Sequence, residues 1–373
     1  MTQNRVLLLY ISEVSGHHHA TLAIEKTLKE LDPKVLTCNL NAFSYTSPFL
    51  ERIVNKAYMG VIKRTPRLWE YLYDNPVFIR RTQKIKDAVH KANFKKFDKL
   101  FAEFNPTAVV CAQAYPCGLI ADYKRVFGIR VPLFGVLTDF LPHAYWVYKE
   151  VDYFIVPSEE AQVRLISEGV AEGRIKKLGI PIDPKFSLPL KREEIFAKLR
   201  LDPALPVVLI MGGGQGLGPI KHVVTALEKT DRDVQLIVVT GINSKLLKWL
   251  KAKSADFLNR VFPLEYANNI EELMEISEII VSKPGGLTTA EALAKGLPMV
   301  IVKPIPGQEE NNTRILLRRG VAVRVDQPEE ITREIEVLLH NRQRLQLMRT
   351  KAKALGRPDS AFDIARLILQ HHD

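Results

Sequence analysis

Short apolar runs alternate with longer stretches of helical spacing along the first half of the chain. Residues from about 17 to 31 place apolar side chains at the spacing of an amphipathic helix. The predicted strands of this half are residues 6–11, 35–40, 108–111, 133–136, 152–156 and 175–178. Because strands and helices alternate, we expect a parallel sheet with helices on its faces.

A break that contains two prolines separates this series from a second one. Residues 179–184 read Gly-Ile-Pro-Ile-Asp-Pro, and we place a domain boundary there. After a helical stretch at 193–199, strands are predicted at 207–211, 235–240, 261–264, 279–282, 299–302 and 322–325. A chain of 373 residues is long enough for two cores. The sequence therefore predicts two open α/β domains whose parallel sheets face each other across a cleft, with ligands at the carboxyl ends of the strands.

The segment from Ser282 to Glu291 has the pattern of a nucleotide-sugar site. It follows a buried apolar strand, and Gly285 and Gly286 allow a ligand to approach the backbone closely. A helix is expected from residue 287 to 295, so its free N–H groups and positive dipole end point at the glycine turn. Thr288 and Glu291 share a helix face, which places a hydroxyl for phosphate beside a carboxylate for ribose hydroxyls. This arrangement suits a nucleoside diphosphate.

A second glycine-rich segment, residues 212–218, follows the first strand of the second domain and precedes a helix. That is the context of a phosphate-binding loop, and a purely structural tight turn is the alternative. Its spacing differs from G-x-G-x-x-G, and no acidic residue ends the next strand, which argues against a Rossmann dehydrogenase. With Gly285 and Gly286 it forms a predicted two-sided diphosphate clamp.

A histidine follows the first strand of the first domain. Gly16 permits a sharp turn, and a neutral His17 at the mouth of the cleft could take a proton from an acceptor hydroxyl. A helix-start histidine without a catalytic role is the alternative. The three histidines at 17–19 do not converge on one helix face, so no metal site is predicted.

Two further segments supply polar groups after predicted strands. Asp139 and His143 could orient His17 or the acceptor, with Trp146 as an apolar wall. A helix-capping aspartate and a tryptophan that fills the core are the alternatives. After the strand at 299–302, Gln308 and Glu309 offer donors and acceptors for sugar hydroxyls, or else are charges without a target.

The net charge of +11 is concentrated in one region. Residues 51–99 carry thirteen basic and five acidic side chains, together with aromatic residues and apolar residues at helical spacing. This pattern suggests a surface that sits on anionic lipid, and a solvated helix face is the alternative. The candidate acceptor and membrane residues are Arg64, Arg67, Trp69, Tyr71, Arg80, Arg81 and Trp146.

Several features of the sequence predict a protein that stays inside the cell. No apolar run approaches the ~20 residues of a membrane span, and the start runs into a strand in place of a signal peptide. The three cysteines lack metal-ligand spacing and suit reduced thiols. We expect no tightly bound cofactor, no metal and no nucleic-acid partner.

Six segments together resemble a known family, in the same order over nearly the whole chain, from about residue 6 to 324. They are Gly16-His17, Thr138-Asp139, the 179–182 segment, the 212–218 loop, Lys283-Pro284-Gly285-Gly286-x-Thr288-x-x-Glu291 and Pro306-Gly307-Gln308-Glu309-x-x-Asn312. The family is that of the bacterial diacylglycerol glucosyltransferases and monogalactosyldiacylglycerol synthases, in glycosyltransferase family 28. A more distant relative is the N-acetylglucosaminyltransferase of peptidoglycan assembly.

The resemblance implies the GT-B fold, two Rossmann-like domains, and inverting transfer from a UDP-sugar co-substrate. It implies an acceptor- and membrane-binding domain at 1–183, a UDP-sugar domain at 184–355, and a last segment, 356–373, whose helix returns to the first domain. His17 would be the general base, with Asp139 and His143 in the acceptor-side catalytic region. The implied donor-binding residues are Gly16, Gly214, Gln215, Tyr266, Ala267, Pro284, Gly285, Gly286, Thr288, Thr289, Glu291, Gln308, Glu309 and Asn312. Gln215 and the pair His18-His19 depart from the family pattern.

The predicted activity is therefore transfer of glucose or galactose from UDP-glucose or UDP-galactose to diacylglycerol. The product would be a β-glycosyl lipid, made by a cytoplasmic protein attached peripherally to the inner face of the cell membrane. Two alternatives remain: a polyprenyl-linked or small hydroxylated acceptor, and a basic nucleic-acid-binding protein. UDP-induced stabilisation would separate the enzyme readings from the last one.

Overall fold

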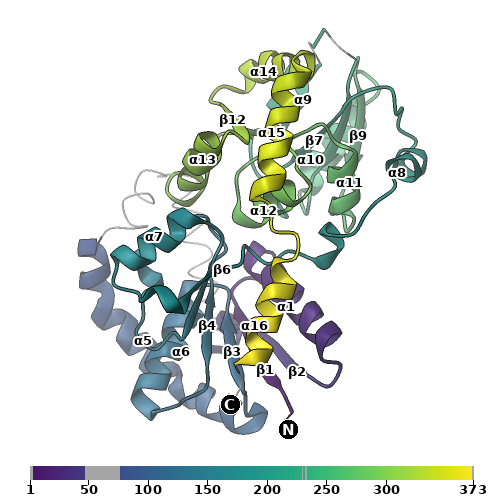
Figure 1. The fold of residues 1–373 in the computed structure, drawn as a ribbon. Helices are drawn as coiled ribbons and strands as arrows, with labels where there is room; N and C mark the ends of the chain where they lie inside the picture. Colours follow the sequence, from purple (N-terminus) through teal and green to yellow (C-terminus); the bar gives the residue numbers. More distant parts are fainter. Residues whose placement is uncertain (1–2, 47–75, 229, 232, 372–373) are drawn as a thin grey trace. The chain divides into compact units, whose positions relative to one another are not determined.

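The computed structural model describes residues 3–46, 76–228, 230–231 and 233–371. It divides into two compact units (Figure 1). The first unit consists of residues 1–184, 306–308 and 359–373, and the second of residues 185–305 and 309–358. Each unit contains one six-stranded sheet in which all neighbouring strands are parallel.

The sheet of the first unit has the order β2-β1-β3-β4-β5-β6. Its strands are β1 (Arg5–Tyr10), β2 (Leu36–Asn41), β3 (Ala108–Cys111), β4 (Leu133–Val136), β5 (Tyr153–Val156) and β6 (Ile175–Lys177). Its helices are α1 (Gly16–Leu31), α2 (Ala42–Thr46), α5 (Pro76–Phe104), α6 (Ala114–Phe127), α7 (Glu159–Ser167) and α16 (Ser360–Gln370). The short 3-10 helices of this unit are η1 (Ala144–Trp146), η2 (Glu172–Arg174) and η3 (Pro184–Phe186), the last of which crosses the boundary.

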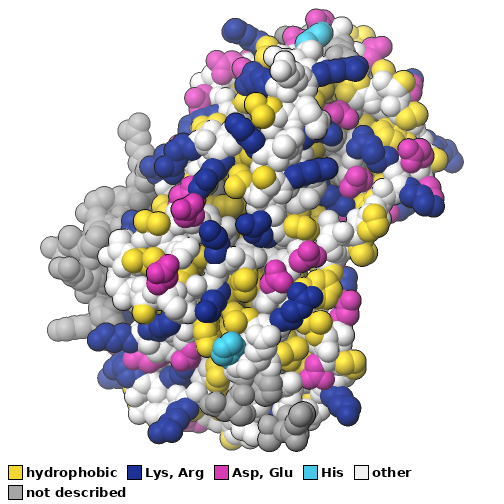
Figure 2. Space-filling model, in the orientation of Figure 1, with side chains coloured by type: hydrophobic (Ala, Val, Ile, Leu, Met, Phe, Trp, Pro, Cys, Tyr) yellow, Lys and Arg dark blue, Asp and Glu magenta, His cyan; other side chains and the backbone are white. Residues whose placement is uncertain are grey.

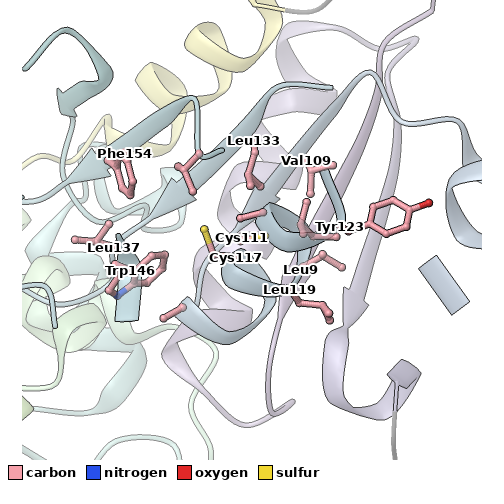
Figure 3. Packing of buried hydrophobic residues seen from close by; sticks show 14 of the residues in the cluster. Leu9, Val109, Cys111, Cys117, Leu119, Tyr123, Leu133, Leu137, Trp146 and Phe154 are labelled. Carbon is pink, nitrogen blue, oxygen red and sulfur yellow. The ribbon is translucent and has the colours of Figure 1, made fainter. Parts of the chain in front are cut away.

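Successive strand residues point to opposite sides of this sheet, and both sets are buried, so each face carries a core. Leu7 and Leu9 of β1 join one core with residues of α5 and α6, and side chains from β1, β3, β4, β5 and α6 converge there (Figure 3). Val6 and Leu8 join the other core with α1 and α16, which run side by side (Figure 1). The Thr27 hydroxyl lies 3.1 Å from the carbonyl oxygen of Ala361, to which it donates. The last helix of the chain is therefore part of the first unit.

The sheet of the second unit has the order β12-β11-β10-β7-β8-β9. Its strands are β7 (Val207–Met211), β8 (Gln235–Val239), β9 (Arg260–Leu264), β10 (Ile279–Ser282), β11 (Met299–Val302) and β12 (Ala322–Val325). Its helices are α8 (Arg192–Leu199), α9 (Ile220–Leu227), α10 (Ser244–Lys253), α11 (Ile270–Ile276), α12 (Gly286–Ala294), α13 (Gln308–Arg319), η4 (Pro328–Glu330), α14 (Ile331–His340) and α15 (Arg342–Leu355). Alternate residues of its central strands, such as Val208 and Ile210, pack into one core with α9, α10 and α14.

The predicted fold class is confirmed. Every strand expected from the apolar runs is present, with ends that differ by no more than one residue. The helix expected at 287–295 begins one residue earlier, at Gly286, and Gly296 follows it with a φ of 63°. The loops that carry the candidate site residues leave the carboxyl ends of the strands.

Candidate functional site

Residues 11–16, which link β1 to the first residue of α1, are called the α1 turn, and His17 follows in the first turn of the helix. Ser15 is the N-cap of α1: its Oγ accepts from the His18 N–H at 3.3 Å and donates to the Ser12 carbonyl at 2.6 Å. His17 Nδ1 lies 2.9 Å from the carbonyl oxygen of Ala112 and 2.8 Å from the hydroxyl of Thr138. Ala112 follows β3 and Thr138 lies just beyond β4, so neighbouring strands orient the ring.

These partners determine which nitrogen of His17 can accept a proton. A carbonyl oxygen can only accept a hydrogen bond, so Nδ1 carries the hydrogen and Nε2 presents its lone pair. Burial lowers the pKa of His17 to about 4, and the hydrogen bond to Ala112 opposes that shift. The ring is therefore neutral at pH 7 and has its basic atom at Nε2.

His143 and Trp146 follow β4 in the same unit. Burial lowers the pKa of His143 to about 4, and the nearby His17 adds to the shift. Trp146 is 5% exposed and packs in the core that includes residues of α5 and α6 (Figure 3). This position agrees with the alternative in which the tryptophan fills the core. Asp139 is partly exposed at the same strand end. The Ala112 carbonyl could not be predicted from the sequence, since a backbone acceptor has no residue signature.

In the second unit, residues 282–286 form the α12 turn. Gly285 is the N-cap of α12 and supplies no side-chain hydrogen bond, so N–H groups of the first helical turn stay available. A Cβ on Gly285 would meet nothing within 4 Å, which leaves this side of the turn open. Asn312 is fully buried, and its amide donates to the Pro284 carbonyl at 2.9 Å. Ser282 donates to the Met211 carbonyl at 2.8 Å, so the turn is anchored from two sides.

The first turns of α12 separate the two predicted threonines. Thr288 is partly exposed, whereas Thr289 is 0% exposed and its hydroxyl has no hydrogen-bond partner among the described residues. Glu291 is partly exposed on the same helix. Burial and then the charge of Glu291 raise the pKa of Tyr266, which follows β9. The charge of Glu291 therefore acts on Tyr266, and Ala267 is the next residue after Tyr266.

Backbone packing explains part of the glycine loop, residues 212–218. A Cβ on Gly216 would lie 2.0 Å from the Thr240 carbonyl oxygen, and one on Gly241 would lie 2.2 Å from that of Gly214. The N–H of Ile242 donates to the same Gly214 oxygen at 2.9 Å. These glycines are required because the loop packs on the segment after β8. Gly214 and Gln215 remain at least partly exposed.

Glu309 already has partners for both carboxylate oxygens. Lys283 Nζ lies 2.9 Å from Oε1, and the N–H of Ile305 donates to Oε2 at 2.7 Å. A contact with a sugar hydroxyl would therefore be made at an oxygen that already has one partner. Gln308 begins α13 and is partly exposed, and the 306–308 segment groups with the first unit.

Much of the predicted acceptor and membrane surface lies outside the part of the chain that the structure describes. Arg80 and Arg81 lie on α5, whereas Arg64, Arg67, Trp69 and Tyr71 lie outside the described residues. On the face drawn in Figure 2, basic and acidic side chains are intermixed. No helix in the described part of the chain is long and apolar enough to span a membrane. Within that same part, no three His, Cys, Asp or Glu side chains are grouped to hold a metal ion.

Comparison with solved structures identifies the fold class of the protein. The MurG structure of Acinetobacter baumannii matches with a TM-score of 0.64 at 15% identity, covering 98% of this chain and 99% of that one. Anabaena Alr3699/HepE in complex with UDP-glucose matches at 0.55 and 16% identity, covering 98% of each chain. Two α/β units, each with a parallel sheet and with candidate site loops at the carboxyl ends of its strands, define a GT-B fold.

The sequence comparisons identify the family. Residues 17–182 match the model of monogalactosyldiacylglycerol (MGDG) synthase, and residues 207–364 match the glycosyltransferase family 28 C-terminal domain. The processive diacylglycerol beta-glucosyltransferase of Bacillus subtilis (strain 168) is 30% identical over 376 residues, covering 100% of this chain and 96% of that protein. That of Bacillus cereus (strain AH187) is 31% identical over 372 residues, covering 98% and 93%. The chain belongs to this family of diacylglycerol glycosyltransferases, and the predicted resemblance is confirmed.

Proposed function

We propose that this protein transfers glucose or galactose from a UDP-sugar to the free hydroxyl of diacylglycerol, with inversion, giving a β-glycosyl diacylglycerol. Full-length similarity to proteins named processive diacylglycerol beta-glucosyltransferase supports the acceptor and glucose. A solved structure with the same fold contains UDP-glucose, which supports the donor class.

The proposed chemical step rests on the neutral His17 ring, whose Nε2 has a free lone pair. Its Nε2 lone pair accepts the proton of the acceptor hydroxyl while that oxygen attacks the anomeric carbon. The bond from that carbon to the UDP oxygen breaks, and UDP leaves with the electron pair. Ala112 and Thr138 hold the ring by Nδ1, which keeps Nε2 for the proton. We assign Asp139 and His143 to the acceptor side of this step.

The second unit is assigned to the donor. The N–H groups of the α12 turn offset the negative charge that grows on the diphosphate as the sugar bond breaks. Glu291 accepts from the ribose hydroxyls, and Tyr266 with Ala267 lies beside the uracil. Gln308 and Glu309 form hydrogen bonds with the hydroxyls of the sugar. Asn312 positions the α12 turn through its hydrogen bond to the Pro284 carbonyl.

Product analysis tests this function. The purified protein is given diacylglycerol vesicles with UDP-glucose or UDP-galactose, and lipids are analysed by mass spectrometry. We expect a hexosyl diacylglycerol with one of the two donors and a β-linkage by NMR. UDP binding without any lipid product would refute the acceptor, and absence of UDP binding would refute the donor.

We further propose that the basic, aromatic stretch 43–99 attaches the protein to anionic lipid at the inner face of the membrane. Its thirteen basic side chains between residues 51 and 99 support an electrostatic attachment. Sedimentation with phosphatidylglycerol vesicles should bring down the protein at low salt, and less of it at high salt. An amount of bound protein that does not change with salt, or that equals the amount bound to neutral vesicles, would contradict this role.

A further inference from the structure

Lys283 and Glu309 form an ion pair that joins two loops at the carboxyl edge of the second sheet. Lys283 follows β10, and Glu309 lies in the first turn of α13, after β11. Their side chains are only 15% and 12% exposed, and Nζ lies 2.9 Å from Oε1. The other carboxylate oxygen accepts the N–H of Ile305. Glu309 is therefore held at one oxygen by a backbone N–H and at the other by the Lys283 ammonium.

Lys283 also lies beside the glycine loop. A Cβ on Gly218 would be 4.0 Å from Cδ of Lys283, so the lysine stem passes this loop. Lys283 also lines a small hollow with residues of β7, β10 and the start of α9, and it is the charged residue of that lining. The lysine side chain thus lies next to the two turns, 212–218 and 282–286, that carry the glycines of the diphosphate clamp.

A diphosphate needs more positive charge than these turns supply. The N-terminus of a helix is equivalent to about half an elementary charge, whereas the diphosphate of UDP carries at least two negative charges. A lysine ammonium has three N–H donors, and bonds between ionised partners are among the strongest hydrogen bonds in proteins. Without a ligand, an ammonium on a side chain that is only 15% exposed needs a counter-ion, because desolvating an unpaired charge is costly. Glu309 fills that role at rest.

We propose that Lys283 exchanges partners when the donor binds. Its ammonium leaves Oε1 of Glu309 for the diphosphate, while Oε2 of Glu309 stays on the Ile305 N–H. The freed Oε1 then accepts a hydrogen bond from a hydroxyl of the hexose. The inference rests on the proposed UDP-sugar donor, and it adds that the site for the sugar is completed only after the diphosphate has bound.

Binding of UDP and of uridine, measured by calorimetry on the full chain, tests the exchange. Lys283→Met should weaken UDP about 10- to 100-fold, the usual loss for a hydrogen bond to a charged group, and leave uridine unchanged. Glu309→Gln can still accept from the Ile305 N–H and should bind UDP at least as tightly as the wild type, because no ion pair must be broken. Lys283→Arg should retain most of the UDP affinity.

Lys295→Met is the matched control. Lys295 lies at the other end of α12, is paired with Glu275 at 3.0 Å, and its side chain is 5% exposed. It should leave UDP affinity unchanged even where it lowers thermal stability. Equal UDP affinity in Lys283→Met and wild type would overturn the exchange, as would equal losses for UDP and uridine. Glu309→Gln weakening UDP as much as Lys283→Met would also overturn it. Failure of the wild type to bind UDP would instead refute the proposed function.

Discussion

The α1 turn and the α12 turn each link an interior parallel strand to a helix, but the two helix starts are completed differently. The α1 turn is capped by the side chain of Ser15, whereas Gly285 leaves the α12 turn without a side-chain cap and open to solvent. The first turn thus presents a neutral imidazole held by two neighbouring strands, and the second presents bare backbone donors. One βα arrangement can therefore hold a base or receive an anion, according to whether a side chain satisfies the helix start.

The largest expected effect separates the two turns. His17→Ala should lower kcat by about 10²- to 10⁴-fold, the usual contribution of a general base, and leave UDP affinity at the wild-type value. Steady-state kinetics together with calorimetry measure both quantities. His19→Ala, at the exposed position two residues further on, is the control and should retain activity. Full activity in His17→Ala would remove the assignment of the base.

A smaller effect should follow from making the α12 turn resemble the α1 turn. Gly285→Ser fits the extended backbone at this position, and its hydroxyl can cap the N–H groups that the donor needs. UDP affinity should fall about tenfold, as when hydrogen bonds to a charged group are lost. The free energy of unfolding should meanwhile rise by roughly a few tenths of a kcal/mol.

Calorimetry and thermal unfolding of Gly285→Ser test this opposition of binding and stability. Gly173→Ser, at an open glycine of the first unit, is the control and should not affect UDP binding. If Gly285→Ser bound UDP as tightly as the wild type, the backbone N–H groups of the α12 turn would not be the anion receptor.

The smallest effect concerns pH. Because the pKa of His17 is lowered to about 4, kcat/KM should change less than about twofold between pH 8 and pH 6. A change in kcat/KM centred near pH 6.5 would contradict a neutral base with a lowered pKa. Between pH 6.5 and 4 the unfolded chain binds protons at His17 and His143 that the folded chain does not. The free energy of unfolding should therefore fall as pH drops through this window, in urea titrations of wild type but less in His17→Ala.

The strands were predictable because each buried parallel strand is a short apolar run ended by glycine, proline or polar residues. The α12 turn and the α1 turn were predictable for a related reason, since a glycine between a strand and a helix marks a close approach of backbone. The roles of single side chains were harder to predict. Thr288 and Thr289 are neighbours in sequence, yet helix geometry leaves the first partly exposed and buries the second completely.

The sequence by itself determined the two α/β units, the family, and the positions of His17 and the glycine turns. These follow from local patterns of apolar residues and from short motifs. Only the tertiary structure decided that Ala112 and Thr138 select the nitrogen of His17 that stays basic. It also decided that Lys283 forms an ion pair with Glu309. Each of these contacts joins residues from different strand ends, so it exists only once the parallel strands have aligned their carboxyl ends at one edge. No pattern in the chain records which side chain meets a backbone carbonyl or a counter-ion there.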